Sequence, residues 1–283
     1  MSNQSNLWFD AVERLKKNKL AIFSALVLIF LVVLTLFAPL LAPHTYYDQN
    51  LDLGAVPPNA TYWFGTDTLG RDQFSRIIYG TRVSLLVGFV ATIVALIIGV
   101  SWGIVAGFFG GRIDSFMMRI VDVLYGLPFI IFIVLLMVIF GRNIWLLFLA
   151  IGAVEWLTMA RIVRSQVLGL KNQEFVMAAQ ALGVKNLSLF VRHILPNILG
   201  TIVIYATLTI PQVMLLEAFL SFLGLGVQPP MSSLGTLIRY GVESMEEYPW
   251  MLIFPGIVFS LTLYCLNFFG DGLRDAIDPK SSN

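Results

Sequence analysis

The sequence predicts an all-α membrane protein with six transmembrane helices, and two observations support this fold class. Of the 283 residues, 58% are hydrophobic and 12% are charged, whereas a soluble domain contains about 25% charged residues. The apolar residues also form long runs, and a bilayer core of about 30 Å requires roughly 20 apolar residues per spanning helix. Because one soluble core would not bury this much apolar surface, lipid is the expected solvent.

Six apolar runs are long enough to be considered as spans. They cover residues 20–42, 83–109, 120–140, 144–159, 198–225 and 250–269. The fourth run is the weakest because it is short. The first run has 23 residues, longer than the roughly 7 to 15 apolar residues of a signal peptide, and is therefore expected to be a retained span.

The distribution of Lys and Arg predicts the orientation of the spans. Five basic residues lie in segments assigned to the outside, and the other 13 of the 18 lie inside. The outer five are Arg71, Arg76, Arg82, Arg142 and Arg239. Since basic residues concentrate in cytoplasmic loops, both termini are expected in the cytoplasm. The predicted layout is a cytoplasmic segment (1–19), the first span, an external loop (43–82), a core of five spans (83–269) and a cytoplasmic tail (270–283).

Both long outer loops carry signals of local structure. In the first loop, Asp72 is expected to cap a short interfacial helix at residues 73–79, after turns at Gly65 and Gly70. The second loop, residues 227–248, ends beside Tyr248 and Trp250, which suit the aromatic belt of a membrane interface.

Glycine recurs at every fourth position along the second span. Gly99, Gly103, Gly107 and Gly111 lie on one slowly drifting helix face. Such a face lets another helix backbone approach closely. The pattern predicts helix packing, but it leaves open whether the partner is another span of this chain or a separate subunit. Pro128, Pro211 and Pro255 fall inside the third, fifth and sixth spans and predict bends there.

Residues for catalysis or metal binding are hard to find. His44 and His193 are predicted on opposite sides of the membrane, and the single cysteine, Cys265, lies in an apolar run. The sequence contains no Gly-Lys dipeptide, so it has no phosphate-binding P-loop of the usual pattern. The net charge of +1 gives no basic face for nucleic acid. Neither a catalytic site nor a metal site is expected, and active transport would depend on an ion gradient or on a partner.

Residues 165–197 form a charged segment on the cytoplasmic side. Within it, residues 174–182 contain good helix formers, and Gly183 is expected to end that helix at positive φ. A second helix is predicted at residues 186–194, ended by Leu195 and Pro196 where the fifth span begins. The small side chains of Ala178 and Ala179 favour a shallow docking surface for another protein, although an ordinary loop helix has the same pattern.

This segment resembles the EAA loop of the permease subunits of bacterial ABC importers. Ala178, Ala179, Gly183, Leu195 and Pro196 stand at the required distances. The sequence departs from the motif at Met177, which replaces the usual Glu, and at Ile194, which is one place late. Glu174, one turn earlier, is the candidate for the missing carboxylate.

Four further segments resemble the second permease subunit of peptide and nickel importers, with the oligopeptide type closest. They are "FGTDTLGRD", "MARIVRSQVLGLKNQEF", "FLSFLGLGVQPP" and "GDGLRDAIDPK". The resemblance implies the type I (MetI-like) permease fold in the bacterial inner membrane and an alternating-access pathway. It also implies a heteromeric complex with a second related permease, two cytosolic ATPases that carry ATP and Mg, and an external peptide-binding protein. In that family residues 165–197 couple the permease to the ATPase.

The alternatives are a dipeptide or nickel permease of the same family and a gradient-driven secondary transporter. A secondary transporter typically contains internal repeats, and none is visible in this sequence. Glu155, about midway along the fourth span, is expected to face protein or water, since a charge facing lipid at a helix centre is costly. It is a candidate for the translocation pathway. Alternatively it is a structural residue that is bonded between helices, or it lies nearer the inner interface because the fourth span is short. Glu217, near the outer end of the fifth span, is the second pathway candidate.

Overall fold

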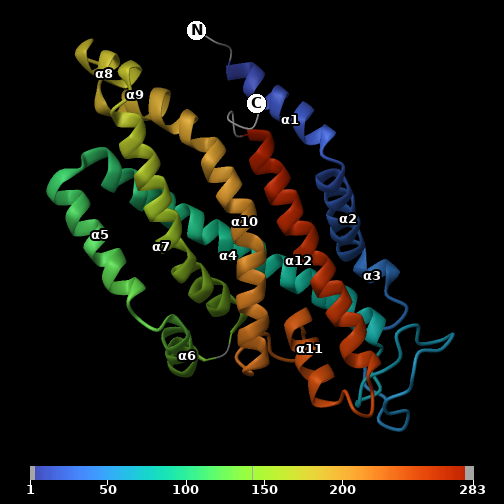
Figure 1. Cartoon of the computed structure of the whole chain (residues 1–283). Coiled ribbons are helices and arrows are strands. Elements are labelled where there is room, and N and C mark those ends of the chain that lie inside the picture. Colours follow the sequence, from blue (N-terminus) through green and yellow to red (C-terminus); the bar gives the residue numbers. More distant parts are fainter. Residues whose placement is uncertain (1–3, 142, 278–283) are drawn as a thin grey trace.

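The computed structural model describes residues 4–141 and 143–277, and these residues are almost entirely helical (Figure 1). The prediction of an all-α fold is confirmed: in these two ranges the only β pairing is the isolated bridge between Thr66 and Asp72. The helices are α1 (Gln4–Lys17), α2 (Lys19–Leu36), α3 (Ala38–Leu41), α4 (Gln73–Phe109), α5 (Gly111–Tyr125), α6 (Phe129–Phe140), α7 (Ile144–Lys171), α8 (Glu174–Ala181), α9 (Asn186–Leu189), a π-helix (Phe190–Ile194), α10 (Leu195–Phe222), α11 (Leu234–Glu243) and α12 (Trp250–Ile277).

Five helical stretches of the described chain have the length and hydropathy of a membrane span. They are α2, α4, α7, the continuous stretch Phe190–Phe222 and α12. The third predicted span, residues 120–140, is not one straight helix. It falls on the pair α5 and α6, which are bent by 80° at a break between them. Counting this pair as one broken span gives six.

The break between α5 and α6 follows from the sequence Gly126-Leu127-Pro128. Pro128 is the N-cap of α6, with φ −64° and ψ 93°. It has no N–H to donate and disfavours helical geometry in the residue before it. By contrast, Pro211 and Pro255 lie inside continuous helices. Of the three prolines expected to bend a span, Pro128 alone stands at a helix break.

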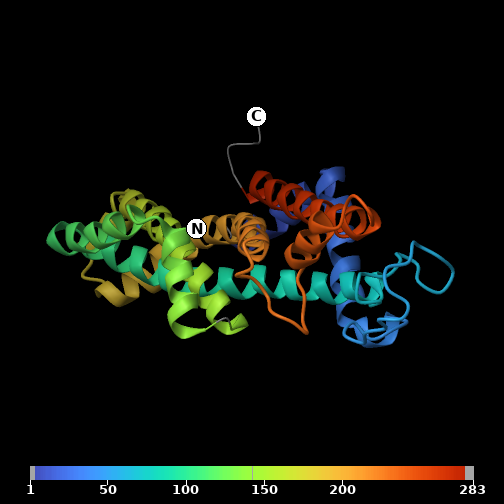
Figure 2. The ribbon, with the colours of Figure 1, turned by 90° about the horizontal axis from the view of Figure 1, so that it is seen from below.

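Helix α4 is longer than predicted because no residue interrupts it near its start. Asp72 caps it as expected, accepting a hydrogen bond from the Ser75 amide at 2.9 Å. The interfacial helix predicted at 73–79 does not end before the span, so one helix of 37 residues results. In Figure 2, α4 runs along the molecule from the segment before Gln73 to the start of α5.

The later helices also extend beyond their predicted ends. Helix α7 continues from Ile144 to Lys171 rather than ending near residue 159. Pro196 does not end a helix but lies in the first turn of α10, directly after the π-helix Phe190–Ile194. The residues predicted as a cytoplasmic tail, 270–283, begin inside α12, which continues to Ile277. The rest of that tail lies outside the described residues.

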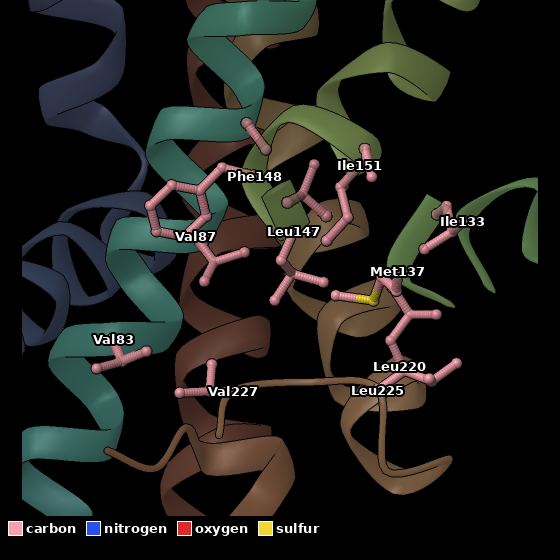
Figure 3. Packing of buried hydrophobic residues seen from close by; sticks show 13 residues of the cluster. Val83, Val87, Ile133, Met137, Leu147, Phe148, Ile151, Leu220, Leu225 and Val227 are labelled. Atoms are coloured by element: carbon pink, nitrogen blue, oxygen red, sulfur yellow. The ribbon is translucent and has the colours of Figure 1, made fainter. Parts of the chain in front are cut away.

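A buried apolar cluster holds the middle of the bundle together (Figure 3). Helix α4 contributes Val83 and Val87, and α6 contributes Ile133 and Met137. Other members come from α7, from α10 and from the segment after α10, among them Leu147, Phe148, Ile151, Leu220, Leu225 and Val227. Within the broken span, α6 contributes to this cluster, and α5 packs through Val121 on a second buried cluster with Trp156 and Leu157 of α7.

The two ends of the molecule carry different structures. Helices α8 and α9 lie at the same end as α1 and the C-terminal part of α12, and α11 lies at the other end (Figure 1). There, residues 43–72 are tied to the helices: the Trp250 Nε1 donates to the Thr66 oxygen at 3.0 Å, and Gln73 Nε2 donates to the Met251 oxygen at 3.3 Å. Asp67, 1% exposed, forms ion pairs with Arg71 and Arg76.

Candidate functional site

Helix α8 ends in a Schellman motif centred on Gly183. This glycine has φ +75°, the left-handed conformation that its position requires. The Gly183 amide donates to the Gln180 oxygen at 2.9 Å, and the Val184 amide donates to the Ala179 oxygen at 3.2 Å. The chain therefore reverses sharply between α8 and α9, as the sequence predicts. A Cβ at Gly183 would meet no atom within 4 Å, so the backbone conformation rather than space requires glycine here.

A small buried cluster fixes α8 to the membrane helices. Val176, Ala179 and Leu189 are its buried members, and Phe108 of α4 packs against them. Lys171, the last residue of α7, donates a hydrogen bond from Nζ to the Phe108 oxygen at 2.8 Å. The loop is therefore attached to the C-terminal ends of both α4 and α7.

Away from this cluster, the surface of α8 and its C-cap is open. The C-cap residue Leu182 is 84% exposed, and Met177 and Phe175 of α8 are 50% and 44% exposed. Glu174 lies in the first turn of α8, where its negative charge is favourable. The two alanines do not form one surface as predicted, because Ala178 is exposed and Ala179 is buried. Leu195 and Pro196 are half-buried in the first turn of α10.

Three of the four glycines on the predicted packing face lie against α7. A Cβ at Gly99 would lie 2.7 Å from Met159 Cβ, one at Gly103 would lie 2.5 Å from the Ala160 oxygen, and one at Gly107 would lie 2.9 Å from Val167 Cβ. The packing partner of this face is therefore another span of the same chain. Gly111 is different: α4 ends at Phe109, so Gly111 belongs to α5, has φ +55° and has no atom within 4 Å of a Cβ.

The structure places Glu217 in a buried polar cluster rather than at a surface. Its side chain is fully buried and accepts hydrogen bonds from Ser221 Oγ at 2.5 Å and from Ser84 Oγ at 3.4 Å. Ser84 Oγ also accepts a hydrogen bond from the Leu234 amide at 3.0 Å. Glu217 thus joins α4, α10 and α11 within this chain, which corrects the expectation that it lines a pathway.

Glu155 lies near the middle of α7 and is half-buried. Among the residues that the structure describes, its carboxylate has no hydrogen bond and no ion pair. The structural alternative, a carboxylate bonded between helices of this chain, therefore has no partner to support it. Next along α7, Thr158 bonds the Tyr125 hydroxyl at 3.1 Å, and Arg161 pairs with Asp122 at 2.7 Å.

The sequence interpretation missed α11 and its polar anchor. Ser233 is the N-cap of α11, and its Oγ accepts a hydrogen bond from the Thr236 amide at 3.1 Å. A Ser directly before the first apolar residue of a helix is a recognisable N-cap signal. Cys265 is buried and free. Within the described ranges, no group of three His, Cys, Asp or Glu side chains is placed to hold a metal ion.

Comparisons with known proteins agree with this architecture. Residues 99–283 match the family described as "Binding-protein-dependent transport system inner membrane component", and residues 6–58 match the "N-terminal TM domain of oligopeptide transport permease C". The structure resembles the protein in "Inward facing conformations of the MetNI methionine ABC transporter", with a TM-score of 0.60, 19% identity, and coverage of 71% of this chain and 96% of that chain. At this identity the likeness concerns the fold alone, and it confirms the type I permease architecture.

Two curated relatives are much closer in sequence. The oligopeptide transport system permease protein OppC of Haemophilus influenzae is 47% identical over 277 residues, covering 97% of this chain and 89% of the relative. The dipeptide transport system permease protein DppC of Bacillus subtilis is 47% identical over 272 residues, covering 96% and 85%. The resemblance read from the sequence motifs is therefore confirmed. The chain belongs to the family of binding-protein-dependent transport system inner membrane components, the multi-pass permease subunits of ABC importers.

Proposed function

We propose that this chain is the transmembrane permease subunit of an ATP-driven importer that carries peptides across a bacterial cytoplasmic membrane. The relatives named for oligopeptide and for dipeptide transport support a peptide substrate. Within that class, the match of residues 6–58 to an oligopeptide permease domain favours oligopeptides over dipeptides. The chain itself binds no cofactor and hydrolyses no ATP.

The importer needs partners that this chain does not supply. A second, related permease completes the pathway, and two cytosolic ATPases carry ATP and Mg. An external binding protein delivers the peptide. The excess of Lys and Arg in the segments with α8, α1 and the end of α12 supports a cytoplasmic position for that end of the molecule and for both termini.

The observation that carries this proposal is the exposed apolar surface of α8 and its C-cap. Phe175 and Met177 of α8 and the C-cap residue Leu182 are large exposed apolar side chains outside the long apolar helices. Exposed apolar patches of this kind are typical of protein interfaces. The cluster around Val176 fixes α8 to α4, so an ATPase bound there would move the membrane helices with it.

The function is tested by reconstituting the complex in liposomes. The chain, its companion permease and the two ATPases are co-expressed, and uptake of a labelled peptide is measured with the external binding protein present. Uptake is expected with ATP and not with an ion gradient alone. Peptide uptake by this chain without any ATPase would contradict the proposal and favour a gradient-driven transporter.

Docking is tested at two adjacent residues of the coupling segment. Leu182→Glu places a charge on a surface that is 84% exposed, so the permease should still insert. ATPase retention in detergent should fall at least about tenfold, because the charge would be buried in the interface. Gly183→Asp should do the same, whereas Gly183→Asn adds no charge, tolerates positive φ and should retain more ATPase. Full retention in both charged variants would show that the ATPase docks elsewhere.

A further inference from the structure

A polar cluster interrupts the apolar surface between α5 and α7. Arg161 pairs with Asp122 at 2.7 Å, and its guanidinium carbon lies 4.3 Å from the centre of the Tyr125 ring. The Tyr125 hydroxyl bonds Thr158 at 3.1 Å. The cluster is open, since the side chains of Arg161 and Asp122 are 43% and 63% exposed. Together with Glu155, these four residues are here called the α5–α7 polar face.

The position of this face along α7 is inside or at the edge of the bilayer core. Trp145, 70% exposed, begins α7 and marks its outer boundary. At 1.5 Å per residue, Glu155 lies about 15 Å and Arg161 about 24 Å along the helix from Trp145, against a hydrocarbon thickness of about 30 Å. An exposed ion pair at this depth is costly in lipid, so the face requires water or protein opposite it.

The break in the third span falls on the same side as this face. Gly126, Leu127 and Pro128 follow Tyr125 directly, and all three are exposed. Backbone that leaves helical geometry at membrane depth is tolerated only against protein or beside a water-filled cavity. The exposed ion pair and the exposed break are separate observations, and both exclude lipid from this surface.

Glu155 adds a free acid to the face. It lies three residues before Thr158, and its carboxylate has no partner within the described chain. The face thus contains the Glu155 carboxylate, which has no cationic partner in the described chain, and the Arg161 guanidinium, which is paired with Asp122. A peptide brings complementary groups, an ammonium at one end and a carboxylate at the other.

We infer that the α5–α7 polar face is the wall that this chain contributes to a water-filled peptide passage. Glu155 attracts ammonium groups, and Arg161 attracts carboxylates while remaining hydrated beside Asp122. This inference rests on the proposed function, and it names the residues of the pathway that the function requires.

Water access is measured with single cysteines in a Cys265→Ala background of the assembled complex. Thr158→Cys lies on the polar face, and Leu149→Cys, on the opposite side of α7 and 57% exposed, is the matched control. A charged methanethiosulfonate reagent should modify Thr158→Cys at least about tenfold faster than Leu149→Cys, because charged reagents react only from water. An excess of peptide should slow the reaction at Thr158→Cys alone.

The charge of the face is tested by Glu155→Gln, which keeps the shape of the side chain. Uptake of a lysine-rich peptide should fall about tenfold relative to a neutral peptide, a change in selectivity that a purely structural role would not produce. Equal slow labelling at both cysteines, with and without nucleotide, would mean a dry subunit interface and would overturn the inference. Because wild-type uptake with ATP is measured in the same vesicles, that result would leave the proposed function intact.

Discussion

Replacing Gly103 tests the contact between α4 and α7 most directly. A Cβ at this position would lie 2.5 Å from the Ala160 oxygen, 2.8 Å from Val163 Cβ and 2.9 Å from the Arg164 amide nitrogen. Two of these three atoms belong to the α7 backbone, which has no rotamer to change. Ordinary contact begins at 3.4 Å, so Gly103→Ala requires the helices to separate by about 1 Å, a shift typical of overpacked cores.

The expected cost of that separation is about 1–3 kcal/mol, the usual range for a methyl group forced into a filled site. The separation also loosens the neighbouring contacts at Gly99 and Gly107, so the effect should lie at the upper end. Gly169→Ala is the matched control: this glycine lies in α7, the helix that Gly103 contacts, is exposed, and has no atom within 4 Å of a Cβ. Helix propensity alone makes Gly169→Ala neutral or stabilising.

The assay is thermal unfolding of the purified permease in detergent, followed by peptide uptake in liposomes. Gly103→Ala should unfold at a lower temperature than the wild type, and Gly103→Val at a lower temperature still. Gly169→Ala should match or exceed the wild type. Wild-type stability in Gly103→Val would show that α4 and α7 do not approach as closely as the structure places them.

Two further predictions concern the end of the molecule that carries α11 and the orientation of the chain in the membrane. Asp67→Asn removes the charge that pairs with Arg76, which is 2% exposed, and should cost about 3–5 kcal/mol of unfolding free energy because a buried cation is left unpaired. Glu243→Gln is the control: it breaks the exposed pair with Arg239 and should cost about 0–1 kcal/mol. Equal melting temperatures for the two variants would contradict this prediction. The orientation is tested with single cysteines in a Cys265→Ala background. Cysteines at the exposed positions Ala60 and Glu246 should react with a membrane-impermeant thiol reagent in intact cells, whereas one at Lys185 should react only in inverted vesicles. The reverse pattern would refute the proposed orientation.

Most of the fold is predictable from the sequence because its main signals are local. Apolar length locates each span, and Gly183 ends α8 because few other residues adopt its φ of +75°. The sequence also predicts the N-cap of α4 at Asp72. The local pattern does not show whether neighbouring helices are continuous. No residue between 79 and 83 ends a helix, so the short helix predicted at 73–79 is the first part of α4.

The remaining differences come from contacts between segments far apart in the sequence. The sequence does not reveal the hydrogen bond that Glu217 accepts from Ser84, which lies 133 positions away. Without that contact, an acid in an apolar span is expected to line a pathway. Pro128 predicts a bend, but the angle of 80° depends on how α6 packs on the buried cluster formed with α4, α7 and α10. The burial of Ala179 beneath an exposed Ala178 likewise depends on Phe108, which arrives from another helix.

The close packing of α4 on α7 has a mechanical consequence. No side-chain layer separates the two backbones at Gly103, and at Gly152 of α7 an added Cβ would lie 2.8 Å from Val94 Cβ, so the pair has little room to slide or compress. Both helices hold the segment that contains α8, through Phe108 and Lys171. Helix α4, with 37 residues, is about 55 Å long. The pair is therefore expected to move as one stiff unit: a tilt of about 5° about the end that holds α8 displaces the Arg76 end of α4 by about 5 Å.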